Sequence, residues 1–170
     1  TRAAWDAQLR RLVYLPLVLP PVRWVLGLHA TALQLGIDGA WAGVWMAHTL
    51  ACVPYVLIAL SPAYTGFDPR LGQVAASLGQ SRLRFLLRVK WPLLRAALTS
   101  ALAVGFAVSV AQYLPTLFVG AGRFNTVTTE AVTLASGAQR SLTSAYAWLQ
   151  WLLPAACFAL AAWAGRPRRF

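Results

Sequence analysis

The sequence predicts an all-α fold, a polytopic bundle of membrane-spanning helices that forms a single domain over residues 1–170. Three observations predict it. The chain is 59% hydrophobic and only 11% charged, which is too apolar for an ordinary soluble domain. Its apolar residues gather in runs long enough for the helix of about 20 residues that crosses a hydrocarbon core. Its basic residues lie mostly between these runs.

Four runs are predicted to span the membrane, over residues 12–33, 40–60, 94–119 and 143–164. The first run carries Arg23 and three prolines. Because proline has no backbone N–H to donate, Pro20 and Pro21 predict a break in this first helix. Trp45, inside the second run, is expected to pack in the interior of the bundle.

The net charge of +11 is explained by membrane topology rather than by binding to nucleic acid. Twelve of the fifteen Lys and Arg lie before the first run, between the second run and the start of the third (Arg95 included), or after the fourth. Arg123 and Arg140 fall on the other side, and Arg23 lies within a run. Because positive residues stay in the cytoplasm, we expect both ends of the chain and the loop 66–92 to face inward.

This loop opens with a predicted short helix. Asp68 can accept hydrogen bonds from the first free N–H groups of the helix, and Pro69 suits its first turn. Helical spacing places four apolar residues on one face: Leu71, Val74, Ala75 and Leu78. Gly79 is predicted to end the helix, because glycine readily takes the positive φ of a tight reversal.

A second short helix is predicted after this turn. Ser81 can cap it, and its basic residues form the polar side. Pro92 is placed in the first turn of the third span. The predicted order is therefore helix, glycine turn, helix and membrane span.

The loop resembles that of a known family, the membrane-spanning permease subunits of bacterial ATP-binding-cassette (ABC) importers. In that family the loop carries E-A-A, three residues, G, nine residues, I, any residue, and L-P. With Gly79 on the glycine, the matching positions are Gln73, Val74, Ala75, Val89, Trp91 and Pro92. The segments "LPLVLPPV" and "AHTLACVPYVLIAL" also look like the family, so the resemblance covers nearly the whole chain.

The resemblance implies the MetI-like permease fold in the bacterial inner membrane. Residues 66–92 would be a coupling helix pair that docks in a groove of an ATPase subunit. The implied partners are ABC ATPase subunits, a second permease half or subunit, a periplasmic solute-binding protein and the lipid bilayer, with no cofactor. The family has at least three spans before this loop and two are predicted here, so we expect a C-terminal part of a permease.

Two questions about the loop stay open, namely the effect of Gln73 and whether the loop binds lipid instead of an ATPase. Gln73 stands where the family usually has Glu, and Gln can only hydrogen-bond where a carboxylate could pair with a basic residue of the ATPase. The competing interpretation is an amphipathic helix that its arginines hold on anionic lipid. That interpretation does not explain the spacing of Gly79 and Pro92.

Arg23, Gln112 and Tyr113 are the candidates for lining the solute pathway. A charge within a span costs about 3 kcal/mol or more without water or a partner, so Arg23 either attracts an anionic group, or faces a polar interior or snorkels. Asp38 could pair with it only if the helices pack closely. Gln112 and Tyr113 sit beside Pro115 at a predicted kink, where they either line the pathway or make interhelical hydrogen bonds.

The remaining polar residues are interpreted mainly as structural. His29 and His48 are expected to be hydrogen-bonded packing residues rather than proton relays. Cys52 and Cys157 have no metal-type spacing and are expected to pack. In the loop before the last span, Thr128 or Thr129 is expected to cap a short helix ended by Gly137. The charged residues of that loop either meet a solute-binding protein or are solvated: Arg123, Glu130 and Arg140.

The sequence contains no Ser-His-Asp, metal or phosphate-loop constellation, so no enzyme activity is predicted. His48 with Asp38 is the nearest candidate pair for an intramembrane enzyme, and it lacks a nucleophile. A standalone channel or scaffold is the alternative function. "YLPTLFVGAGRFNTVTTEAVTL" looks most like the branch of the family that imports polyamines, thiamine, iron(III) or sulfate-type solutes. Because no acidic residue lies deep in a span, the chain argues mildly against a polyamine.

Overall fold

The computed structural model describes residues 2–137 and 140–166, with the side chains of residues 2–7, 9 and 10 left aside. Helices and connecting turns make up these residues, and no strand occurs among them. The predicted all-α fold is confirmed. Of the basic residues that set the predicted topology, Arg168 and Arg169 lie outside the described part of the chain.

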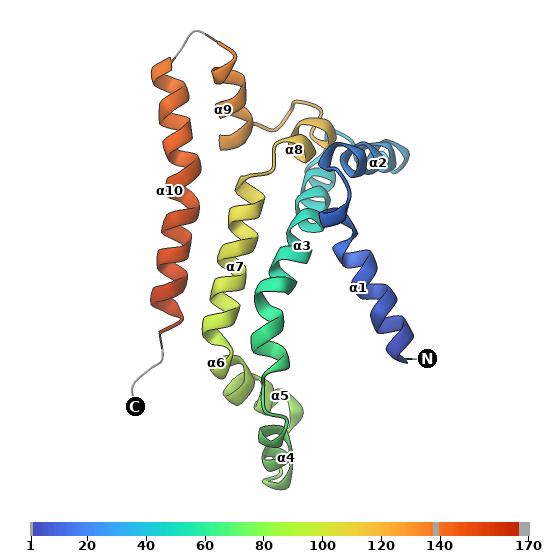
Figure 1. Cartoon of the computed structure of the whole chain (residues 1–170), viewed down its shortest axis with the longest axis vertical. Coiled ribbons are helices and arrows are strands. Elements are labelled where there is room, and N and C mark those ends of the chain that lie inside the picture. Colours follow the sequence, from blue (N-terminus) through green and yellow to red (C-terminus); the bar gives the residue numbers. More distant parts are fainter. Residues whose placement is uncertain (1, 138–139, 167–170) are drawn as a thin grey trace.

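Three upright helices form the body of the molecule (Figure 1). α7 (Arg95–Val110) lies between α3 (Trp41–Thr65) and α10 (Arg140–Ala164) and packs against both. The short helices α8 (Leu114–Val119) and α9 (Val127–Ala135) lie at one end of this body. The segment between α3 and α7, which includes α4 (Arg70–Ser77) and α5 (Arg82–Phe85), extends from the opposite end. The basic loop 66–92 is therefore separated from Arg123 and Arg140 by the length of the bundle.

The first predicted span is bent rather than straight. α1 (Arg2–Val18) and α2 (Pro21–Gln34) meet at an angle of 119° between residues 11–18 and 21–34. Pro20 and Pro21 lie at the bend, where their missing N–H groups interrupt the helical hydrogen bonds. The predicted break is confirmed, and it turns α2 across the α8 end of the bundle (Figure 1).

Two described helices, α3 and α10, are each long and apolar enough to cross a membrane. Up to four spans result if each bent pair counts as one, the second pair being residues 82–93 and 95–110, which meet at 74°. The count of four therefore stays a prediction. The third predicted span, 94–119, is not one helix, because α7 ends at Val110 and α8 begins only at Leu114.

A small buried cluster fixes α2, α3 and α8 together. It consists of Ala32, Ala47 and Val119, with Leu28 and Ile37 packed against them. The Gly39 N–H donates to the Val119 carbonyl at 2.9 Å. Small residues allow α2, α3 and α8 to approach one another closely. A methyl group on Gly43, for example, would collide with the Ile37 carbonyl.

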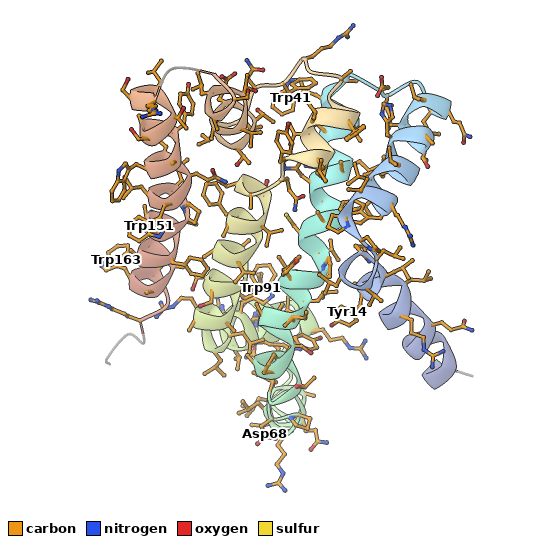
Figure 2. All side chains as sticks on the ribbon, turned by 45° about the horizontal axis from the view of Figure 1, so that its top comes forward. Tyr14, Trp41, Asp68, Trp91, Trp151 and Trp163 are labelled. Carbon is orange, nitrogen blue, oxygen red and sulfur yellow. The ribbon has the colours of Figure 1, made fainter. Side chains whose placement is uncertain are left out.

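The outer faces of the upright helices are apolar and exposed. On α10, Trp148, Trp151 and Trp163 are exposed, and Figure 2 shows Trp151 and Trp163 on the outer side of the bundle. Such a face suits lipid or another membrane helix. Trp45 is 71% exposed, so the expectation that it packs in the interior of this chain is wrong.

Candidate functional site

The segment between α3 and α7 begins with a capped helix. The backbone N–H of Arg70 donates to Asp68 Oδ1 at 2.9 Å, so Asp68 accepts from the first N–H of α4 as the sequence predicts, while Pro69 occupies the N-cap position itself. Asp68 lies at the tip of the segment, far from Trp41 at the other end of the molecule (Figure 2). This cap is local in sequence, which is why the residues alone could predict it.

Gly79 ends α4 in a Schellman turn. Its φ is +70°, and the Gln80 N–H donates to the Ala75 carbonyl at 2.9 Å while the Gly79 N–H donates to Ala76 at 3.0 Å. No atom lies within 4 Å of the position that a Cβ of Gly79 would take. The glycine is therefore required by its backbone conformation, and the space beside it is open.

The second helix of the segment contains a π turn. Ser81 caps α5, accepting from the Arg84 N–H at 3.3 Å. The π-helical turn η1 (Leu86–Lys90) and α6 (Trp91–Leu93) follow without a break. The Trp91 N–H donates to the Leu86 carbonyl, five residues back, and Pro92 has no N–H with which to continue an α-helical pattern.

Pro92 does not start the third membrane helix. The chain bends at Leu94, and α7 begins only at Arg95. The expectation that Pro92 sits in the first turn of this span is wrong. Its place in the first turn of the short α6 is still one where the missing N–H costs little.

The residues that match the family loop divide between exposed and buried positions. Val74 is 54% exposed and Leu78 is 72% exposed, and Gln73 is also exposed. Ala75 is only 8% exposed, so it is not part of the predicted apolar ridge. Of the later positions, Val89 is half-buried, whereas Trp91 and Pro92 are exposed. The surface offered to a partner is therefore narrower than the sequence suggested.

Aromatic residues attach this segment to the end of α3. The Phe67 and Phe85 rings meet edge to face with centroids 6.3 Å apart. Lys90 Nζ lies 3.9 Å from the centroid of the Tyr64 ring and 5.4 Å from that of Phe67. These contacts were not among the predicted ones. The available signal was the presence of Tyr64, Phe67 and Phe85 in or beside the loop that holds Lys90.

A chain of hydrogen bonds crosses the bundle near the α8 end. Thr116 Oγ1 donates to the Gln112 carbonyl at 2.9 Å, so it accepts from His48 Nε2–H at 2.8 Å. In the neutral ring, Nδ1 then accepts from the Ser109 hydroxyl at 2.9 Å. His48 is a hydrogen-bonded packing residue, as predicted. Its partners Ser109 and Thr116 were missed, because they lie more than 60 positions away in sequence.

Two cavities lie along α3, and Ser109 is the lining residue that α7 contributes to both. The first, of about 410 Å³, lies between Trp41, Trp45, His48 and Ser109 and the loop residue Arg123. The second, of about 420 Å³, shares Trp45, His48 and Ser109 and continues along α3 past Cys52 to Leu57. Because they share three residues, the two cavities form one concave face. Their volumes are those of small-molecule sites.

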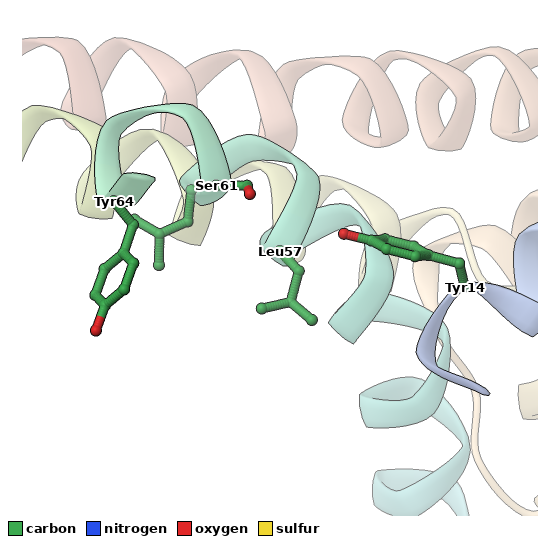
Figure 3. A pocket seen from close by; sticks show the side chains of 5 residues that line it. Tyr14, Leu57, Ser61 and Tyr64 are labelled. Carbon is green, nitrogen blue, oxygen red and sulfur yellow. The ribbon is translucent and has the colours of Figure 1, made fainter. Parts of the chain in front are cut away.

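A third cavity lies between α1 and α3, nearer the loop 66–92. It measures about 290 Å³ and is lined by Tyr14, Leu57, Leu60, Ser61 and Tyr64. In Figure 3 the Tyr14 side chain extends from α1 toward α3, and Tyr64 lies at the other end of the group. No sequence motif indicated this cavity.

The predicted pathway residues are not brought together. Gln112 and Tyr113 lie half-buried in the break between α7 and α8, and the Arg23 side chain is exposed on α2. Asp38 does not pair with Arg23. Its Oδ1 lies 3.1 Å from His29 Nδ1, without the geometry of a hydrogen bond, so the contact is ionic only when His29 is protonated.

The outer loop forms the predicted short helix with a different cap. Thr126 caps α9 by accepting from the Thr129 N–H at 3.2 Å, and Thr129 Oγ1 accepts from the Thr126 N–H at 2.7 Å. Thr128 instead donates to the Val110 carbonyl at the end of α7. The expectation that Thr128 or Thr129 is the cap is wrong. Gly137 does follow the helix.

Comparison with known proteins decides the family. The chain is 45% identical to the inner membrane ABC transporter permease protein YnjC of Escherichia coli (strain K12), in an alignment of 170 positions that covers 97% of this chain and 33% of YnjC. The chain belongs to the ABC transporter permeases. The predicted location in the inner membrane is thereby confirmed.

Other relatives are also permeases. The chain is 32% identical to the molybdenum transport system permease protein ModB of Mycobacterium tuberculosis, in an alignment of 127 positions that covers 68% of this chain and 48% of ModB. It is 26% identical to the spermidine/putrescine transport system permease protein PotC of Haemophilus influenzae over 108 residues, 64% of this chain and 42% of PotC. The chain thus spans between a third and a half of these relatives. No family model and no solved structure matches it.

Proposed function

We propose that this chain forms the solute pathway of an ABC importer and couples it, through the loop 66–92, to ATP hydrolysis by a separate ATPase subunit. The observation that carries the proposal is the exposed ridge of Leu71, Val74 and Leu78 at the tip of the molecule, followed by the open Gly79 turn. Large apolar side chains exposed together on a projecting helix favour a partner surface. A helix that inserts its apolar side chains into a groove is a common mode of such recognition.

The geometry of the segment supports coupling rather than simple attachment. α4 is joined to α3 through Phe67 and to α7 through the helix of α5, η1 and α6. A displacement of α4 by an ATPase therefore reaches both helices that line the concave face. A helix lying flat on lipid would not need to project from the end of the bundle (Figure 1).

The concave face between α3 and α7 is the proposed pathway surface, completed by a second permease half. This face is proposed as the lining of the solute pathway in place of Arg23, Gln112 and Tyr113. Arg123 lines its outer cavity and no carboxylate does so, which favours an anionic or neutral solute. PotC is named for spermidine and putrescine and ModB for molybdenum, and the cavity suits the latter kind of solute better. A solute-binding protein would meet the α8–α9 end.

An affinity purification of the full-length protein from detergent-solubilised native membranes, with mass spectrometry of the co-purifying proteins, tests the proposal. We expect an ABC ATPase with the native protein and its loss with Gly79→Trp. Gly122→Trp is the matched control, because Gly122 also has a positive φ, of +68°, and open space but lies at the opposite end. An ATPase lost equally from both variants would contradict docking at Gly79.

The same experiment judges the alternative function. If the native protein brings down no ATPase, a standalone channel or scaffold explains the chain better. Gly79→Asn separates two causes of loss, because Asn tolerates a positive φ and adds a side chain. Loss of the ATPase with Gly79→Asn would mean that the partner approaches the backbone closely at this turn.

A further inference from the structure

The ammonium group of Lys90 lies on the faces of two aromatic rings. Its Nζ is 3.9 Å from the centroid of the Tyr64 ring and 5.4 Å from that of Phe67. Within the described part of the chain, no Asp or Glu oxygen lies within 4 Å of it. The rings are therefore the interaction that the structure gives this charge, and both distances are within cation–π range.

These rings form one end of a packed series that reaches the proposed docking helix. Phe67 meets Phe85 of α5 edge to face. The Phe85 ring in turn lies against α4, where a Cβ on Gly72 would be 3.7 Å from it. Tyr64 belongs to the last turn of α3. A continuous set of side chains thus joins α4 to α3, and Lys90 is its link to η1.

Lys90 lies within the π turn. A π turn holds one residue more than an α turn, so the helix is locally irregular at this residue. Lys90 is the last residue of η1, directly before α6 and the bend at Leu94. The irregular turn and the ring contacts therefore occur at the same point, where the segment passes the end of α3.

We propose that Lys90 is a positioning residue that clamps η1 to the end of α3 through the Tyr64 and Phe67 rings, so that movement of α4 reaches α3 as well as α7. That an ATPase subunit moves α4 rests on the proposed function, whereas the clamp itself does not. Without the clamp, α4 would still act on α7 through the helix, but on α3 only through residues 66–69 and the contact of Phe67 with Phe85. The competing role of Lys90 is a contact with anionic lipid headgroups, which needs no ring.

Amide hydrogen exchange of the full-length permease in lipid nanodiscs tests the clamp. We expect Lys90→Met and Tyr64→Leu each to speed exchange in residues 82–93 by about 2- to 30-fold, the range that one cation–π contact supports. The double variant should exchange no faster than the faster single variant. Lys90→Arg and Tyr64→Phe keep a cation and a ring, so they should behave as the native protein. Arg88→Met removes an exposed charge from the same turn and should have no effect.

Three results would each overturn the proposal. Faster exchange in Lys90→Met but not in Tyr64→Leu would assign Lys90 to lipid, and unchanged exchange in both would show that the contact holds nothing. Transmission is measured in the complex with its ATPase, where a non-hydrolysable ATP analogue should alter exchange at the end of α3 in the native protein but not in Lys90→Met. An equal response to the analogue in the native protein and in Lys90→Met would also overturn the proposal. If no ATPase co-purifies while the exchange pattern holds, the proposed function fails and the clamp stands.

Discussion

His48 and Thr116 join the middle of α3 to the first turn of α8 through a hydrogen bond of 2.8 Å between Nε2 and Oγ1. Thr116 lies three positions after the break between α7 and α8, and its hydroxyl also bonds the Gln112 carbonyl within that break. Irregular backbone at membrane depth is tolerated only where its polar groups find partners in the protein. The histidine and the threonine therefore stabilise the interruption between α7 and α8.

Replacing Thr116 with Val should destabilise the protein by about 1–3 kcal/mol, because His48 Nε2–H and the Gln112 carbonyl each lose a buried partner. Thermal unfolding of the purified full-length permease in detergent measures the change. Thr49→Val is the control, since its hydroxyl bonds only the Trp45 carbonyl of its own helix. Equal melting temperatures for the two variants would contradict the role given to Thr116.

The comparison of α4 with the α7–α8 break shows what the sequence could predict. The caps of Asp68, Gly79 and Ser81 involve neighbours two to four positions away, so residue types and spacing were sufficient. The burial of Ala75 and the bonds of His48 to Ser109 and Thr116 depend on how distant elements pack. A single sequence does not contain that information.

Two of the wrong predictions have local causes. Thr126, Thr128 and Thr129 are all suitable cap residues, and the contact of Thr128 with the Val110 carbonyl selects Thr126 as the cap. Pro92 suits the start of any helix, and the structure uses it in α6 instead of α7 because the chain bends at Leu94. In the outer loop three positions satisfied the same local rule, and at Pro92 the rule did not specify which helix the proline begins, so the residue types alone left both outcomes open.

Gly105 should be intolerant of a larger side chain. A Cβ there would lie 2.9 Å from Val56 Cγ2, and the Cys52 thiol donates to the Gly105 carbonyl at 3.3 Å where α3 and α7 cross. Gly105→Leu should destabilise the permease by about 1–3 kcal/mol through overpacking. Gly27→Leu is the matched control, because no atom lies within 4 Å of its Cβ position on α2. The interpretation fails if unfolding measurements give both variants the same stability.

Gln73→Glu should strengthen binding of the ATPase subunit by about 0.2–1 kcal/mol, the range for an exposed ion pair. Gln73 is exposed on α4 beside the ridge of Leu71, Val74 and Leu78, so its side chain is available to a partner. Titration of the purified ATPase against the permease at low and high salt measures the effect, which salt should weaken. Gln80→Glu adds the same charge beyond the Gly79 turn and should leave the affinity unchanged. A salt-independent gain, or an equal gain from Gln80→Glu, would count against a charged contact at Gln73.

Cys52 provides a direct test of the concave face. It is half-buried on α3 and lines the second cavity with His48 and Ser109, whereas Cys157 lies half-buried on α10. If the α3–α7 face is the solute pathway, water enters it during transport and a charged, membrane-impermeant methanethiosulfonate should modify Cys52. Modification is measured by mass spectrometry in two full-length variants, each with one of these residues as its sole cysteine. Cys52 should react faster than Cys157, and ATP should change its rate because coupling opens and closes the face. Faster reaction at Cys157, or a rate at Cys52 that ATP leaves unchanged, would place the pathway elsewhere.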